Sequence, residues 1–392
     1  MNIRALLASA AAALTLLTAA SAPYNAHAVT PSEPSIVTSC IAANKEEAAA
    51  AVRENLKQRV TEFNVQMPLD GYSLTEIGAH TIYCACEETG IGTEGDYLRF
   101  AIKGYKCKSQ LNEDEVSCTI SYIVDYYTTA EEEARLTEEI GRLTEELSLD
   151  KLSDFSKIHL LYKYVTSNVT YSDDITDPYV YTAYNAVTEH HAVCQGVTQL
   201  LYRLYNDNGI TCRIIAGKSR DTSVFPASEA YHVWLIVKLG ERYYLMDPTW
   251  DMKFRGDSFH YFMKGSTDLD SDFPFYHHAA QNDNGISFPD YNSEEFAARY
   301  PIAHLKYSEP AYSLGNINGD SVTDAVDASL ILTEYARTSG LKMSCLTSSQ
   351  SRYADVNRDG IIDAVDASNV LAYYAALSSG AEMTLAAFLK SH

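Results

Sequence analysis

The chain has 392 residues, of which 46% are hydrophobic and 11% aromatic. This composition supplies apolar side chains for two or three domain cores and excludes disorder throughout the chain. The formal net charge of −22 makes nucleic acids and anionic lipid surfaces poor partners.

Residues 1–28 have the layout of a secretory signal. Arg4 precedes the apolar run 5–20, and a stretch of small residues then ends in Ala26-His27-Ala28, with the expected cleavage site after Ala28. A membrane anchor is the alternative, but the run is short and rich in alanine. We therefore expect a secreted, extracellular protein that is not inserted in a membrane after cleavage.

Eight cysteines fit an oxidising compartment: Cys40, Cys84, Cys86, Cys107, Cys118, Cys194, Cys212 and Cys345. Their pairing cannot be read from the sequence. Cys84 and Cys86, as C-x-C on a strand, would point the same way, which disfavours a bond between them. Separate partners, free thiols or a zinc site remain open for this pair.

The first part of the mature chain, 29–117, predicts an N-terminal α/β extension. Residues 43–62 form an Ala/Glu-rich helical segment, and 70–127 contain short β-like runs such as 96–102 and 119–124. An antiparallel sheet is the natural interpretation.

Two scaffold helices follow. Thr129 and Glu132 form a capping box, and apolar residues recur after it at helical spacing, at Leu136, Ile140, Leu143 and Leu147. Ser153 is the expected N-cap of a second helix over 154–166.

A cysteine begins the next expected helix. Apolar residues recur at helical spacing after Cys194, at Val197, Leu200, Leu201 and Leu204. Asn208 and Gly209 end this helix. Unpaired N–H groups and the helix dipole favour a thiolate at Cys194. Taken alone, a buried structural cysteine is an equally good interpretation.

Two β-rich runs, 231–238 and 241–247, predict a hairpin. A two-residue turn at 239–240 would place His232 directly opposite Asp247, with Cβ atoms about 5 Å apart, within reach of an Asp–imidazole hydrogen bond. A turn one residue longer would put the two side chains on opposite faces, so this register is a hypothesis. A core histidine bonded to backbone is the alternative for His232.

These residues resemble the transglutaminase-like core of papain-type Cys-His-Asp enzymes. The resemblance covers about residues 118–290 and rests on Val-Cys-Gln-Gly at 193–196, His-Val-Trp at 232–234, Asp-Pro-Thr-Trp at 247–250, Val-Thr-Tyr at 169–171 and Tyr-Phe at 261–262. Leu235 departs from the pattern, since relatives often carry asparagine there.

The resemblance implies a thioester acyl-enzyme formed on a peptide or a glutamine carboxamide. Cys194 would attack the carbonyl carbon, His232 would move the proton, and Asp247 would orient the imidazole. Water or an amine would then release the acyl group. The backbone N–H of Cys194 would be one oxyanion donor.

After a linker at 307–313, the chain repeats itself. Asp-Ala-Val-Asp-Ala-Ser occurs at 324–329 and again at 363–368. Each copy completes a twelve-residue loop with side-chain oxygens at positions 1, 3, 5, 9 and 12, typical of a calcium loop. The candidate ligands of two calcium ions are Asn316, Asn318, Asp320, Val322, Asp324 and Asp327 in the first loop and Asp355, Asn357, Asp359, Ile361, Asp363 and Asp366 in the second. A pair of solvated acidic turns is the alternative.

Asp at position 12 and the absence of an entering helix before the first loop distinguish this repeat from a paired EF-hand sensor. It resembles a type I dockerin, the cohesin-binding tail of cellulosomal enzymes, over about 314–385. The resemblance implies cohesin contacts in two near-equivalent orientations, through Ala325, Val326, Ala364 and Val365. It also implies a cell-surface or cellulosome-associated protein.

Together these patterns predict an α+β protein. We expect a papain-like transglutaminase core at 118–306, with a helix-borne cysteine and an antiparallel sheet that bears His232 and Asp247, and a small all-α dockerin at 314–392. The leading functional hypothesis is a dockerin-anchored cysteine peptidase or transamidase acting on protein or peptide. A catalytically silent binding module and polysaccharide degradation by the chain itself are the alternatives.

Overall fold

The computed structural model describes residues 38–222, 228–254, 259–273, 275–280 and 288–391. The expected signal segment lies outside these residues. The chain divides into two compact units. The first holds the described residues up to Gly141 together with Val165–Phe254 and Phe259–Lys306, and the second holds Arg142–Tyr164 and the described residues from Tyr307 onward.

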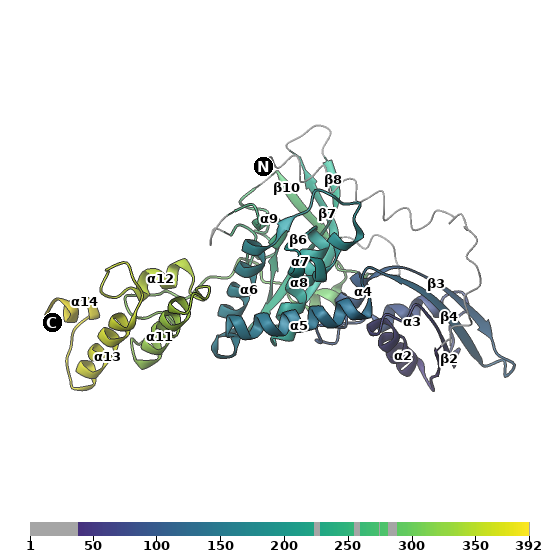
Figure 1. Ribbon diagram of the computed structural model, residues 1–392, viewed down its shortest axis with the longest axis horizontal. Coiled ribbons are helices and arrows are strands. Elements are labelled where there is room, and N and C mark those ends of the chain that lie inside the picture. The colour runs from purple at the N-terminus through teal and green to yellow at the C-terminus, as the bar shows by residue number, and fades with distance from the viewer. Residues whose placement is uncertain (1–37, 223–227, 255–258, 274, 281–287, 392) are drawn as a thin grey trace. The chain divides into compact units, whose positions relative to one another are not determined.

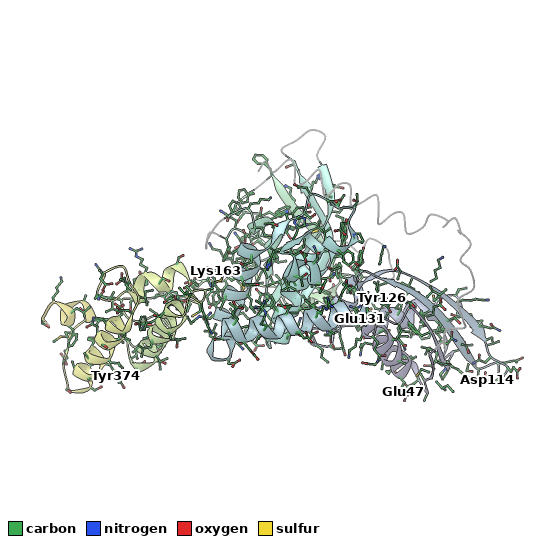
Figure 2. The ribbon with its side chains drawn as sticks, viewed as in Figure 1. Glu47, Asp114, Tyr126, Glu131, Lys163 and Tyr374 are labelled. Carbon is green, nitrogen blue, oxygen red and sulfur yellow. The ribbon has the colours of Figure 1, made fainter. Side chains whose placement is uncertain are left out.

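The first unit begins with a four-stranded sheet in the order β1-β2-β4-β3. Its strands are β1 (Thr38–Ile41), β2 (Glu62–Pro68), β3 (Ile102–Leu111) and β4 (Ser117–Tyr126). The β2–β4 and β3–β4 pairs are antiparallel as expected, whereas β1 runs parallel to β2. Asp114 lies at the tip of the β3–β4 hairpin (Figure 2).

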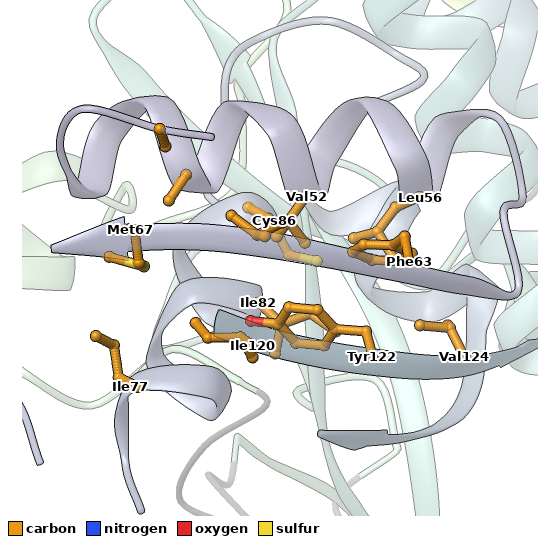
Figure 3. Close-up of a cluster of buried hydrophobic side chains, with 14 of the residues drawn as sticks. Val52, Leu56, Phe63, Met67, Ile77, Ile82, Cys86, Ile120, Tyr122 and Val124 are labelled. Carbon is orange, nitrogen blue, oxygen red and sulfur yellow. The ribbon is translucent and has the colours of Figure 1, made fainter. Parts of the chain in front are cut away.

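Two helices, α2 (Lys45–Lys57) and α3 (Ile77–Ala85), pack with this sheet. Strand β2 alternates buried and partly buried residues, so that Phe63, Val65 and Met67 all point into one core. Val52 and Leu56 of α2 belong to the same cluster, and Figure 3 shows Leu56 next to Phe63. The N-terminal part therefore has a hydrophobic core of its own.

Two sequence-based expectations in this region are wrong. Residues 96–102 are not a strand, because α4 (Asp96–Ala101) occupies them and β3 begins only at Ile102. All six residues of α4 are buried, and a short, fully buried helix has no alternation that separates it from a strand. The C-x-C pair is not on a strand either, since Cys84 lies in α3 and Cys86 caps it. All eight cysteines lie among the described residues and are free.

Helix α5 (Ala130–Leu147) and helix α6 (Asp154–Asn168) follow, separated by the 3-10 turn η2 (Leu149–Lys151). The predicted capping box is confirmed, because the Thr129 N–H donates to the Glu132 carboxylate and the Glu132 N–H donates to Thr129 Oγ1. Ser153 Oγ accepts from the Ser156 N–H and caps α6.

The second sheet of this unit is antiparallel, in the order β10-β7-β8-β9. Its strands are β7 (Cys212–Asp221), β8 (Ser228–Leu239), β9 (Arg242–Met246) and β10 (Tyr276–Ala280). Helix α8 (Cys194–Asp207) packs against β7 and β8. The shorter elements are β5 (Thr170–Tyr171), η3 (Pro178–Tyr181), α7 (Ala183–Thr188), β6 (His191–Ala192), α9 (Pro248–Asp251) and α10 (Glu294–Arg299).

A buried ion pair joins the N-terminal part to this second sheet. The Asp96 carboxylate is fully buried and accepts from Arg213 Nε at 2.7 Å, Arg213 Nη2 at 3.0 Å and the Ile214 N–H at 2.9 Å. Glu88 Oε2 lies 3.4 Å from the same guanidinium. Because a buried charge needs its partner, Asp96 on α4 and Arg213 on β7 hold the N-terminal part against the second sheet.

The C-terminal part is helical. It contains α11 (Ala325–Ser339), α12 (Ser348–Ala354), α13 (Ala364–Ser378) and α14 (Leu385–Ser391). The repeated helices α11 and α13 lie side by side (Figure 1), and Ile331 and Val370 are fully buried. The α+β fold class, with a helical C-terminal module, is confirmed. Within the described residues, no helix has the length and apolar character that a bilayer crossing requires.

Candidate active site and calcium loops

Cys194 is the first residue of α8, with Val193 as N-cap, so the predicted placement at a helix N-terminus is correct. The residues beside it fix the backbone. A Cβ on Gly196 would lie 2.7 Å from Val180 O and 2.8 Å from Thr182 O, and the Gln195 amide donates to the Phe100 carbonyl at 3.1 Å. Cys194 itself is 7% exposed.

His232 and Asp247 meet, but not in the register that the sequence predicted. Leu239 pairs with Arg242, so the turn is Gly240–Glu241 rather than Leu239–Gly240. Gly240 has φ +60°, which suits the first central position of a type II′ turn, where leucine is strained. If this register continues past Met246, Asp247 lies opposite Trp234. His232 is two residues before Trp234 and is therefore a diagonal neighbour of Asp247 on the same face of the sheet.

The diagonal arrangement still gives a short hydrogen bond. His232 Nε2 donates to Asp247 Oδ2 at 2.7 Å, and the two side chains are 4% and 0% exposed. Asp247 is also the N-cap of α9, because its Oδ1 accepts from the Trp250 N–H at 3.1 Å. The indole of Trp250 stacks on the His232 ring at 5.3 Å between centroids. The aspartate and the tryptophan of Asp-Pro-Thr-Trp therefore both hold the imidazole in place.

The imidazole also bonds the cysteine. His232 makes a side-chain hydrogen bond with Cys194, and since Nε2 faces Asp247, the nitrogen left for the thiol is Nδ1. Burial lowers the pKa of His232, but the charge and hydrogen bond of Asp247 and the contact with Cys194 outweigh it and raise this pKa to about 9. Burial raises the pKa of Asp247, but His232 and His278 outweigh it and hold this pKa well below its usual range.

A second histidine touches Asp247, and sequence reasoning missed it. His278 of β10 donates from Nε2 to Asp247 Oδ2 at 3.1 Å and from Nδ1 to Asp270 Oδ1 at 2.6 Å. Its side chain is 1% exposed. The only sequence signal was the pair His277-His278 in a β-like run, which does not say which ring faces the site.

A narrow pocket borders the cysteine. Apart from Cys194, it is lined by Tyr171, Ile175, Tyr181, Val193, Gln195 and Tyr231. Leu235, the departure from the family pattern, lies elsewhere, since it is fully buried and paired with Met246. The lining beside the thiol is therefore largely aromatic and apolar.

The two C-terminal loops have matching internal bonds. Asp327 and Asp366, the loop-ending aspartates, are both fully buried. The Asp327 carboxylate accepts from the N–H groups of Ile317, Asn318 and Asp324, and Asp366 accepts from the three N–H groups at the same places of its own loop. Burial raises the pKa of both aspartates, and these bonds offset only part of it.

The oxygen set of each loop fits a hard cation. Side-chain oxygens alternate along the loop, and the left-handed residues Gly319 and Arg358 occupy position 4 of the two loops. A buried carboxylate with a raised pKa is the group that a calcium ion would stabilise as its anion.

Comparison with known proteins identifies the two modules. Residues 141–248 match the transglutaminase-like superfamily, and residues 314–373 match the type I dockerin domain. The chain thus carries a transglutaminase-like core followed by a type I dockerin, as the sequence motifs indicated. A type I dockerin generally binds calcium and implies a cohesin partner and a cellulosome-type assembly, which is typically extracellular.

Two solved structures resemble part of the chain. One, described as a TGase, is 15% identical with a TM-score of 0.26, and the match covers 54% of this chain and 59% of that one. The other, described as a "Putative Cysteine Protease from Cytophaga hutchinsonii", is 12% identical with a TM-score of 0.25, covering 45% of this chain and 71% of that one. No curated protein matches the chain.

Proposed function

We propose that this protein is a secreted cysteine enzyme that forms a thioester acyl-enzyme on peptide or glutamine carboxamide substrates. The observation that carries the proposal is the continuous contact of Cys194, His232 and Asp247 in one buried site. These are the three groups that nucleophilic thiol catalysis requires: a nucleophile, a proton carrier and an orienting carboxylate.

In the proposed reaction, the Cys194 sulfur attacks the substrate carbonyl carbon, and the carbonyl electrons move to oxygen. The oxyanion is stabilised by the backbone N–H of Cys194 at the start of α8. The His232 imidazolium then gives its Nδ1 proton to the leaving amine, and the C–N bond breaks. Water or a second amine attacks the thioester, His232 accepts its proton, and the thiolate leaves.

The lining of the pocket supports an acyl group with an apolar stem. Tyr171, Tyr181 and Ile175 offer rings and an aliphatic side chain beside the thiol, and no Lys or Arg is among the lining residues. The cavity itself is only about 10 Å³, so the methylenes of a glutamine side chain or the backbone carbons of an extended peptide would pack along these walls rather than inside a deep pocket.

Two measurements test the proposal. We expect rapid alkylation of Cys194 by iodoacetamide at pH 6, abolished by His232→Ala, because an unassisted thiol is mostly protonated at that pH. Mass spectrometry after incubation with a Gln/Lys peptide library then shows cleavage, deamidation or crosslinking. Slow alkylation that does not depend on His232 would contradict the proposal and favour a catalytically silent module.

We also propose that the dockerin holds two calcium ions and uses the ends of its loops to bind cohesin. Val326 and Val365, at equivalent positions of the repeat, are 54% and 51% exposed. The helices continue these surfaces with Tyr335 and Tyr374, 39% and 40% exposed, and Figure 2 shows Tyr374 on α13. Ala325 and Ala364 are likewise exposed.

This near-equality of exposed apolar residues supports two interchangeable binding orientations. Calorimetry with a cohesin should therefore show binding that survives Val326→Asp or Val365→Asp alone and is lost when both are changed. Loss of binding on either single change would contradict the two-orientation proposal.

A further inference from the structure

The Asp247 carboxylate lies between two imidazoles. Its Oδ2 is 2.7 Å from His232 Nε2 and 3.1 Å from His278 Nε2. The second imidazole is bonded on its far side to Asp270, at 2.6 Å, and the His278 backbone N–H donates to the other oxygen of Asp270 at 2.9 Å. His278 and Asp270 thus extend the row of contacts that begins with Cys194, His232 and Asp247.

The geometry sets the charge of His278. An ionised carboxylate only accepts hydrogen bonds, so a ring with a carboxylate oxygen at each nitrogen must donate from both. A ring that carries both protons is an imidazolium. In agreement, Asp247 and Asp270 outweigh the effect of burial and raise the pKa of His278 to about 9.

We propose that His278, held by Asp270, is a positioning residue of this active site: a buried cation that fixes the Asp247 carboxylate and weakens the stabilisation that Asp247 gives the His232 imidazolium. The inference rests on the proposed function, since it concerns how the same cysteine–histidine pair is tuned. His278 touches neither Cys194 nor the pocket beside it among the contacts of the described residues.

Two effects follow from the position of His278. The hydrogen bond fixes the rotation of Asp247, whose other oxygen caps α9, so that Oδ2 stays directed at His232. The positive charge, on a ring 5.6 Å from the His232 ring, opposes a second positive charge on His232. Without it, the imidazolium of His232 would persist to higher pH.

Other charged groups surround the pair. Lys253 lies over the Trp250 ring at 5.5 Å. The Asp251 carboxylate accepts hydrogen bonds from the backbone N–H groups of His260 and Tyr261. Asp272 is bonded to His260 and Lys264. Lys253 also acts on Asp247 through its charge, but His278 is hydrogen-bonded to the Asp247 carboxylate, so His278 is the cation that acts on the triad most directly.

The test uses the full-length protein and two neutral substitutions. His278→Gln keeps a side-chain donor but removes the charge, and Asp270→Asn removes the carboxylate that maintains the charge. His277→Gln, one residue away on β10 and exposed, is the matched control. The rate of Cys194 alkylation by iodoacetate is measured against pH, because its alkaline limb reports loss of the His232 proton that attracts the anionic reagent.

We expect the alkaline limb to move up by about one pH unit in His278→Gln. Asp270→Asn should move it in the same direction, because the lost cation is closer to His232 than the lost anion. His277→Gln should leave it unchanged. A lower rate with an unmoved limb in both variants would overturn the proposal, since a purely structural histidine changes folding or rate but not this titration.

Nuclear magnetic resonance of ring-labelled histidines separates this proposal from the proposed function. Both His278 ring nitrogens should carry protons at pH 7, whether or not Cys194 is reactive. A neutral His278 would overturn the inference and leave the enzyme proposal standing. If Cys194 is unreactive while His278 carries both protons, the enzyme proposal is wrong and the assignment of His278 as a buried cation stands.

Discussion

Replacing Asp247 by asparagine should abolish the reactive state of the cysteine while leaving the protein folded. Oδ2 accepts from both histidines and Oδ1 accepts from the Trp250 N–H. An asparagine keeps only one side-chain oxygen. Facing the two histidine rings, that oxygen accepts two hydrogen bonds, whereas facing the Trp250 N–H it accepts one. Its NH2 then faces the Trp250 N–H, and the lost N-cap costs about 1 kcal/mol.

The larger effect is on the charge of His232. Its pKa, about 9 against a reference of 6.5, corresponds to about 3 kcal/mol of stabilisation of the imidazolium. Without the carboxylate charge, burial remains and lowers this pKa, opposed only by the contact with Cys194, so the pKa returns toward its usual range. At pH 7.5 the imidazolium then falls from nearly all of the protein to roughly a tenth or less.

The assay is the rate of Cys194 alkylation by iodoacetate at pH 7.5, with circular dichroism as the check on folding. We expect Asp247→Asn to react at least about tenfold more slowly. Asp272→Asn, the same change at a 38% exposed side chain nearby, should react like the wild type. A folded Asp247→Asn protein that reacts within threefold of the wild type would refute the assignment of Asp247.

Three further outcomes are expected. Asp96→Ala should lower the free energy of unfolding by about 3–5 kcal/mol in urea titrations, because it leaves the buried Arg213 guanidinium without its main partner. The control Asp125→Ala, at a side chain that is 70% exposed, should change it by less than about 1 kcal/mol. Equal effects of the two substitutions would contradict the structure. Gly196→Ala should reduce alkylation of Cys194 and thermal stability together, since its Cβ would lie 2.7 Å from a carbonyl oxygen; a stable, reactive variant would show that the backbone there yields. Removing calcium by chelation at pH 7 should unfold 314–385, and the calcium-free protein should regain structure when it is moved to pH 4. The raised pKa of the loop-ending aspartates means that the calcium-free fold loses stability as pH rises and these groups ionise. A circular dichroism spectrum that does not change on calcium removal at pH 7 would refute this.

Local patterns predicted what depends on neighbouring residues. The capping box at Thr129, the helix that begins at Cys194 and the apolar helices after the repeated loops all follow from spacing over a few residues. The strand predicted for 96–102 is wrong because burial on every side erased the periodicity of this segment. That burial comes from parts of the chain far away in sequence, including α8 and β7, whose Arg213 bonds Asp96. Long-range burial is therefore what single-sequence patterns least reveal.

The hairpin shows why a wrong register still gave the right contact. The error shifted the pairing by two residues, and because side chains alternate with a period of two, His232 and Asp247 stayed on one face. A long imidazole reaches a diagonal neighbour, so the 2.7 Å bond forms without direct opposition. An error of one residue would have separated the two side chains.

His278 could not be predicted by the same logic. It reaches Asp247 from β10, which pairs with β7 at the opposite edge of the sheet from β9. Because β10 is not part of the β8–β9 hairpin, the pairing that places His232 near Asp247 says nothing about His278. Its position depends on where the chain returns to the sheet after Tyr261 and on Asp270 holding the ring. The triad is set by motifs, whereas the charge next to it is set by topology, and proteins that share the motifs can therefore differ in the pH range over which the same three residues work.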